Sequence, residues 1–197
     1  MSGARPGYPG QSRQGPATSR EARASRLSYT APMPFTDLLL PEFDHEMAVT
    51  RRVLERVPLQ DADWKPHPKS MSLGELATHL AYVPAWTRAT LRDDGYDMSG
   101  DAGERHEVLR TSSELLAVFD RHAAEARQVL AATSDAEMMA PWTLRAGEHV
   151  VFTQPRAGAL RGFIFSHSIH HRGQMVVYLR LRDVPVPSIY GPSADER

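Results

Sequence analysis

The sequence predicts an all-α protein, a four-helix bundle with one short β-hairpin inserted between the third and fourth helices. Four stretches carry apolar residues at the three- and four-residue spacing of a buried helix face. The connection between the last two stretches is long, and its composition is typical of two strands around a glycine turn. Helical bundles build their binding sites between facing helices, so polar side chains on the inner faces are the first candidates for a site.

The first 32 residues differ in composition from the rest of the chain. They are rich in Gly, Pro, Ser and Arg, and five arginines stand against a single acid, Glu21. Such a stretch cannot build an apolar core, so residues 1–32 are expected to form a disordered tail. An Arg-rich targeting peptide and a true translation start at Met33 are the other two interpretations. The folded domain is expected to span residues 33–197.

The first helix is expected to begin at Phe35 or Pro41 and to end at Val57, because Pro58 cannot continue it. Its predicted inner face consists of Leu39, Phe43, Met47, Thr50, Leu54 and Val57.

The second helix is expected over residues 72–92. Ser72 and Glu75 have the spacing of a capping box, which favours a helix start at this point. Pro84 lies inside the pattern and removes a backbone hydrogen bond, so a kink is expected there. The predicted inner face consists of Leu76, His79, Val83 and Trp86.

The third helix is expected over residues 111–132, with Thr111 and Glu114 as a second capping pair. The hairpin is expected over residues 142–153, with its turn at Gly147. The fourth helix is expected over residues 159–182. Apolar residues of the third helix are Leu115, Val118, Phe119, Ala126, Val129 and Leu130, with His122 among them, and those of the fourth are Leu160, Ile164, Met175 and Tyr178.

Composition excludes several classes of protein. The chain has no cysteine, so disulfides, thiolate metal sites and a cysteine nucleophile are ruled out. The formal net charge is −1, and the N-terminal arginines lack interleaved aromatic residues, so no nucleic-acid partner is expected. No apolar run has the length of a membrane span, and no apolar segment of a signal peptide follows the N-terminus. The expected location is the cytoplasm.

The segment from His167 to Gln174 contains the strongest functional pattern. His167 and His171 are four residues apart, so a helix places both on one face, in line with the apolar residues of the fourth helix. His79 lies on the inner face of the second helix. Buried polar groups cost free energy unless they are paired or bind a metal. Three neutral imidazoles that leave a coordination position open form the layout of a catalytic metal site.

The residues alone leave alternatives open. His167 and His171 can also be core histidines bonded to backbone carbonyls, and His170 can pair with His167 in place of His171. Glu75 is either a carboxylate near the site or, more simply, the cap of Ser72. Gln174 is expected to bond a ligand or another helix, and Arg172 to meet solvent or an acidic neighbour. The remaining histidines are interpreted as surface or structural: His45, His67, His106, His122 and His149.

The chain resembles the DinB family. The resemblance rests on Leu40–Glu46, Trp64–Met71, Leu73–His79 and the His167–Gln174 segment, and extends to the ending Pro185–Glu196. It implies a four-helix bundle with up-down-down-up connections, often dimeric, and a three-histidine metal site. Carried over by position, the ligands are His79, His167 and His171, and the metal is commonly zinc or nickel.

The resemblance also implies a range of functions. Some relatives transfer bacterial low-molecular-weight thiols, and the family name comes from induction by DNA damage. The leading hypothesis is therefore a divalent-metal-dependent enzyme, either a thiol-dependent transferase or a hydrolase, in which the metal activates a thiol or water for a small-molecule substrate. The alternative is a non-enzymatic, stress-related helical bundle that binds a metal or small molecule, and a third interpretation is a purely structural role for the histidines. A homodimer is expected.

Overall fold

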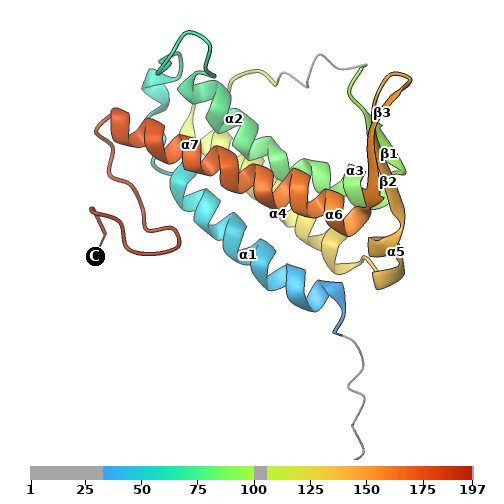
Figure 1. Ribbon diagram of the computed structural model, residues 1–197. Helices are drawn as coiled ribbons and strands as arrows, with labels where there is room; N and C mark the ends of the chain where they lie inside the picture. Colours follow the sequence, from blue (N-terminus) through green and yellow to red (C-terminus); the bar gives the residue numbers. More distant parts are fainter. Residues whose placement is uncertain (1–32, 100–105, 197) are drawn as a thin grey trace, which may run out of the picture. The chain divides into compact units, whose positions relative to one another are not determined.

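The computed structural model describes residues 33–99 and 106–196 (Figure 1). Its helices are, in chain order, α1 (Phe35–Leu54), η1 (Leu59–Asp61), α2 (Leu73–Tyr82), η2 (Val83–Ala85), α3 (Trp86–Arg92), α4 (Ser112–Ala131), α5 (Asp135–Met139), α6 (Arg156–Leu160), η3 (Arg161–Ser166) and α7 (His167–Leu181). Its strands are β1 (Gly95–Asp97), β2 (Pro141–Ala146) and β3 (His149–Pro155). The described part is therefore mostly helical, with a small three-stranded sheet. The expected disordered tail, residues 1–32, lies outside the described residues.

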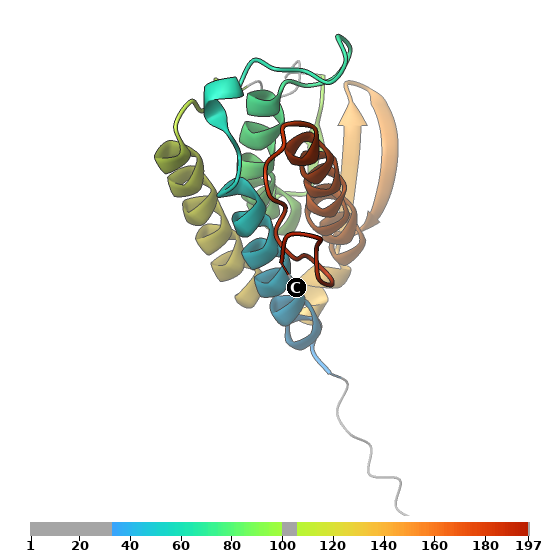
Figure 2. The same cartoon turned by 90° about the vertical axis from the view of Figure 1, so that its left-hand side faces the viewer.

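The long helices pack through the faces that the sequence predicted. Helices α1 and α2 each contact α4 and α7, and the two views in Figures 1 and 2 show these helices side by side. All six residues of the predicted α1 face are buried, as are Leu160, Ile164, Met175 and Tyr178 of the fourth helical stretch. None of the helices in the described part of the chain has the length and apolar content that a membrane crossing requires.

The second predicted helix is interrupted where the sequence placed a kink. Ser72 caps α2 with a complete capping box, in which its side chain accepts from the Glu75 backbone N–H and Glu75 accepts from the Ser72 backbone N–H. The helix then passes through a 3₁₀ turn at Val83–Ala85 before continuing as α3. Pro84 accounts for the change, because it lacks the N–H that an α-helix needs at this position.

The predicted hairpin is present, but it belongs to a larger sheet. Strands β2 and β3 pair antiparallel around Gly147, which has a φ of 63°. The strand β1, absent from the sequence prediction, pairs parallel with β2. At three residues, it is too short to show an alternating pattern. Gly95 is required there, because a Cβ at this position would lie 2.2 Å from the Thr143 carbonyl oxygen.

The fourth predicted helix begins earlier than expected and changes its winding. The chain is helical from Arg156 to Leu181, but η3 is a π-helical segment that ends directly before His167. A π-helical segment widens the helix and shifts the direction of the side chains that follow. Such segments are frequent at functional sites, and this one fixes where α7 and its histidines begin.

A buried ion pair joins α7 to α1. The Arg172 guanidinium lies 2.7 Å from the Glu46 carboxylate, and the two side chains are 1% and 6% exposed. Arg172 also donates to the Glu46 carbonyl oxygen and to Thr50 Oγ1, both at 3.1 Å, and to the Tyr190 hydroxyl. Tyr190 in turn donates to the Glu46 carboxylate. Of the two expectations for Arg172, the acidic neighbour is correct and exposure to solvent is wrong.

Removing one partner of this ion pair is predicted to destabilise the protein strongly. Arg172→Ala leaves the Glu46 carboxylate buried without its counter-charge, which should lower the free energy of unfolding by about 3–5 kcal/mol in urea denaturation. Arg180→Ala is the control, because it breaks an exposed pair with Asp195 and should cost less than about 1 kcal/mol.

The double variant Arg172→Met/Glu46→Leu separates charge from packing. It removes both buried charges and keeps similar volumes, so it should recover most of the stability lost in Arg172→Ala. If the double variant is as unstable as Arg172→Ala, the loss of stability does not come from the unpaired carboxylate of Glu46.

Candidate functional site

Three histidines from two helices meet on the inner faces of α2 and α7. His79 comes from the last turn of α2, and His167 and His171 from the first turns of α7. The two helices run side by side (Figure 1). Each histidine offers one ring nitrogen to a group in which these atoms all lie within 4.8 Å of one another. The arrangement brings together the three residues that the sequence singled out.

The rings contact one another closely. The Nε2 atoms of His79 and His167 lie 2.8 Å apart. The His171 ring centroid lies 4.6 Å from that of His79 and 4.5 Å from that of His167, with steep angles between the planes. Rings in this arrangement point nitrogen atoms toward a common region instead of stacking face to face.

Gln174 determines how His171 presents its ring. Its side-chain carbonyl oxygen lies 2.7 Å from His171 Nδ1, so Nδ1 carries the proton and donates it. Nε2 of the neutral ring is then an unprotonated acceptor. A hydrogen bond of this kind to the far nitrogen is the usual means of orienting a metal-binding histidine. The sequence prediction gave Gln174 a ligand or another helix as its partner; its partner in the structure is His171, three residues earlier on the same helix.

The surroundings favour the neutral form of all three rings. Burial lowers the pKa of His79 to about 4, with a smaller effect from His171 and His106. Burial also lowers the pKa of His167 to about 4, followed by the effects of the neighbouring histidines. The pKa of His171 is lowered by burial, although its bond to Gln174 opposes the change. Neutral imidazole is the form that binds a metal.

An indole ring forms an apolar wall beside the histidines. The Trp86 ring centroid lies 5.6 Å from that of His79 and 5.2 Å from that of His167. Trp86 is the first residue of α3, and the 3₁₀ turn at Pro84 sets its direction. The sequence placed Trp86 on the same face as His79 but assigned it no role at the site.

Other residues considered from the sequence lie outside this group. Glu75 caps α2 and forms an ion pair with Lys65 at 3.2 Å, which confirms the capping interpretation. His170 is exposed on α7, with its ring centroid 4.9 Å from that of His171. His106 and His122 both contact Tyr82. Like His170, three further histidines are exposed: His45, His67 and His149.

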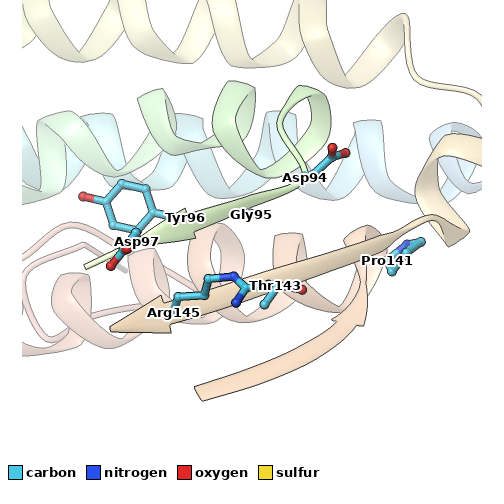
Figure 3. Close-up of a pocket in the computed structure, with 7 residues that line it drawn as sticks. All are labelled: Asp94, Gly95, Tyr96, Asp97, Pro141, Thr143 and Arg145. Atoms are coloured by element: carbon cyan, nitrogen blue, oxygen red, sulfur yellow. The ribbon is translucent and has the colours of Figure 1, made fainter. Parts of the chain in front are cut away.

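A separate cavity of about 600 Å³ lies on the sheet (Figure 3). Its lining residues are Asp94, Gly95, Tyr96, Asp97, Pro141, Thr143 and Arg145. The carboxylates there have structural partners, because Asp94 pairs with Arg156 and Asp97 accepts from the backbone of Gly147 and Ser99. None of the three clustered histidines lines this cavity, so the candidate site is the histidine group.

Comparison with known proteins identifies the family. The family model of the DinB superfamily matches residues 42–175, a range that includes the three histidines and Gln174. The chain belongs to the DinB superfamily.

This DinB chain aligns over about four fifths of its length with a curated relative and with two solved structures. The uncharacterized protein YrdA of Bacillus subtilis (strain 168) is 26% identical over 161 residues, which cover 81% of this chain and 90% of YrdA. A DinB-like protein of Bacillus cereus ATCC 10987 has a similar crystal structure, with a TM-score of 0.61, 19% identity, and coverage of 80% of this chain and 98% of that protein. The DinB-like protein YjoA of Bacillus subtilis gives a TM-score of 0.58 at 18% identity, over 81% and 99% of the two chains. These two structures support the fold.

The lowered histidine pKa values predict that acid destabilises the metal-free DinB domain. The unfolded chain takes up protons near the ordinary histidine pKa of 6.5, whereas folded His79 and His167 resist protonation until about pH 4. Stability should therefore be complete above pH 6.5 and fall as the pH decreases toward 4. Urea denaturation of chelator-treated protein at several pH values measures the slope. His79→Gln removes one histidine of lowered pKa and should therefore reduce the slope of stability against pH. Equal free energies of unfolding at pH 7 and pH 5 in the wild type would contradict the prediction.

Proposed function

We propose that this protein is a metal-dependent member of the DinB superfamily in which His79, His167 and His171 hold one divalent ion. The observation that carries the proposal is the meeting of three half-buried, neutral imidazoles from two helices, with ring nitrogens within 4.8 Å of one another. Family membership supports it, because the residues lie inside the range matched by the family model.

The donor set fits such an ion. Nitrogens bound at about 2.0–2.1 Å to one tetrahedral ion are about 3.3 Å apart. This value lies between the 2.8 Å that separates His79 Nε2 from His167 Nε2 and the 4.8 Å within which the ligand atoms of all three histidines lie. Three neutral imidazoles suit zinc and nickel, which are the proposed metals. They leave a coordination position for a substrate, which is the layout of catalytic sites rather than structural ones. Neither a thiolate nor a carboxylate is needed to complete the group.

The proposed activity is thiol-dependent group transfer or hydrolysis on a small-molecule substrate. A divalent ion in this site supplies uncompensated positive charge, which favours the deprotonated form of a thiol or water. The protein's own residues orient the site: Gln174 fixes the tautomer of His171, and Trp86 excludes water from one side of His79 and His167. With no cysteine in the chain, a sulfur nucleophile has to come from a cosubstrate.

Two competing functions make different predictions. A non-enzymatic metal-binding protein would hold the ion without turning over any substrate. A purely structural role has one observation in its favour, the 2.8 Å contact between His79 Nε2 and His167 Nε2, which is a hydrogen bond if one of the two nitrogens carries a proton. That role predicts no stoichiometric metal.

The finer features of the fold and assembly remain part of this proposal. We infer that residues 33–197 form one DinB domain, whose principal helices have the up-down-down-up connections of the family. A cytoplasmic homodimer is the proposed state of the protein. Sedimentation of the full chain measures the oligomeric state directly.

Metal content tests the proposal. Protein purified without a histidine tag should contain about one divalent ion per chain by mass spectrometry, and the His167→Ala/His171→Ala variant should contain none. His45→Ala/His149→Ala, which removes two exposed histidines, is the matched control and should keep the metal. The wild-type protein can also be incubated with zinc or nickel and then dialysed to remove unbound metal. If it retains no ion, the proposal is overturned in favour of the structural role.

Gln174 is predicted to contribute to metal affinity without touching the ion. Gln174→Ala leaves His171 Nδ1–H without its acceptor, so the ring loses its fixed orientation and metal affinity should fall about 10–100-fold. Gln174→Glu retains an acceptor and should preserve or raise the affinity. Quenching of Trp86 fluorescence by nickel, in a background with the other two tryptophans replaced by phenylalanine, reports binding. Equal affinity in Gln174→Ala and wild type would refute this role.

A further inference from the structure

The small sheet has one packed face and one open face. Trp142 and Leu144 of β2 belong to a buried apolar cluster and are 2% and 4% exposed. Side chains alternate along a strand, so Pro141, Thr143 and Arg145 leave β2 on the opposite face. All three line the cavity of about 600 Å³, which therefore lies on the open face (Figure 3).

Gly95 lines the middle of this cavity and contributes no side chain to it. The residue is paired with Thr143 in the register of β1 and β2. A residue with a side chain cannot replace it, because a Cβ would lie 2.2 Å from the Thr143 carbonyl oxygen. The close approach of the two strands therefore leaves the centre of the cavity uncovered, and charged side chains stand at its two ends.

Arg145 lies at one end of the cavity. Within residues 33–99 and 106–196, its guanidinium has no hydrogen bond and no ion pair. Asp97, its cross-strand neighbour, lies beyond ion-pair distance, and its Oδ1 accepts from the backbone N–H groups of Gly147 and Ser99. Figure 3 shows the Arg145 side chain extending along β2 in the direction of Thr143. Its N–H donors are available to a ligand, and a guanidinium matches the two oxygens of a carboxylate.

A pair of hydroxyl groups adds a neutral donor beside Arg145. Thr143 Oγ1 and Thr153 Oγ1 lie 2.9 Å apart, so one hydrogen bond joins them. Two hydroxyl groups carry two protons, and this bond uses one of them. The other O–H is free to donate to a ligand oxygen. Together, the guanidinium and the hydroxyl pair make β2 the side of the cavity that suits a carboxylate.

Asp94 lies at the other end and carries the opposite charge. Its exposed carboxylate accepts from Arg156 Nη2 at 3.1 Å through Oδ1, and the Arg156 side chain is only 10% exposed. The ion pair holds the carboxylate in place and leaves Oδ2 for a donor from solvent or from a ligand. Asp94 precedes Gly95, which is level with Thr143, so Arg145 lies three residues, or roughly 10 Å, further along the strands.

A ligand with a single charge fits this arrangement poorly. An anion bound to Arg145 would lie near the carboxylates of Asp94 and Asp97, and a cation bound to Asp94 would lie near Arg156. A zwitterion satisfies both ends. The adjacent charges of a single amino acid are too close together for this purpose, whereas two residues in extended conformation span about 7 Å.

We propose that the open face of the sheet binds a small zwitterion of dipeptide size. Its carboxylate accepts from Arg145 and from the hydroxyl pair of Thr143, and its ammonium donates to Asp94 Oδ2. The binding site is separate from the three clustered histidines, and the proposal does not depend on the metal.

Titration with one dipeptide and its two blocked forms tests the proposal. The full chain, labelled with ¹⁵N, is titrated with alanyl-alanine, and binding is followed by the backbone amide shifts of β1 and β2. N-acetyl-alanyl-alanine lacks the ammonium, and alanyl-alanine amide lacks the carboxylate. The wild type should bind alanyl-alanine about threefold or more tightly than either blocked form, because each end loses one exposed charged contact.

Two variants assign the two ends. Arg145→Gln should remove the preference for a free carboxylate and keep the preference for a free ammonium, and Asp94→Asn should do the reverse. Arg52→Gln, which changes an exposed arginine of α1, is the control and should keep both preferences. Arg145 makes no side-chain hydrogen bond or ion pair in the described part of the chain, so its variant should fold normally and decides the question even if Asp94→Asn is unstable.

Three results would overturn the proposal. The first is a wild type in which alanyl-alanine moves no amide signal of β1 or β2. The second is equal affinity of the wild type for the free and blocked dipeptides. The third is a preference for the free carboxylate that persists in Arg145→Gln.

Discussion

The rotation of α7 about its axis decides where its histidines point, and the buried ion pair between Arg172 and Glu46 sets that rotation. Consecutive residues of a helix are 100° apart, so directing Arg172 toward α1 turns His171 toward α2. A charge buried without its partner is costly, which makes other rotations of α7 unfavourable. Arg172 directly follows His171 on α7, so the direction of the His171 ring depends on the ion pair although the pair itself faces α1. Tyr190 joins the same pair and fixes the C-terminal segment to it.

The histidine group combines features that reinforce one another chemically. Burial holds the rings in their neutral form, and Gln174 selects the nitrogen that His171 presents. The 3₁₀ turn at Pro84 brings Trp86 against His79, and the π-helical segment η3 ends where His167 begins. Both departures from regular α-helix thus adjoin the site. A cation there would meet nitrogen donors that need lose no proton at neutral pH.

The sequence predicted the features that depend on local periodicity. Helix faces, the Ser72 capping box and the hairpin turn at Gly147 each follow from a short pattern, and so did the choice of His79, His167 and His171. Features that depend on contacts between distant segments were missed. Strand β1 has three residues and is defined by its pairing with β2. The burial of Arg172 depends on Glu46, 126 positions earlier, and the contact between Leu109 and Thr78 joins the segment before α4 to α2.

The central claim is that one divalent ion is bound by three imidazoles, and X-ray absorption spectroscopy of zinc- or nickel-loaded protein tests it most directly. The account predicts a first shell that contains three imidazole nitrogens at about 2.0–2.1 Å, recognisable by the multiple scattering of the rings. The imidazole count should fall by one in a His79→Ala variant that still retains metal. A first shell made of oxygen ligands, or one with fewer than three imidazoles in the wild type, would contradict the account.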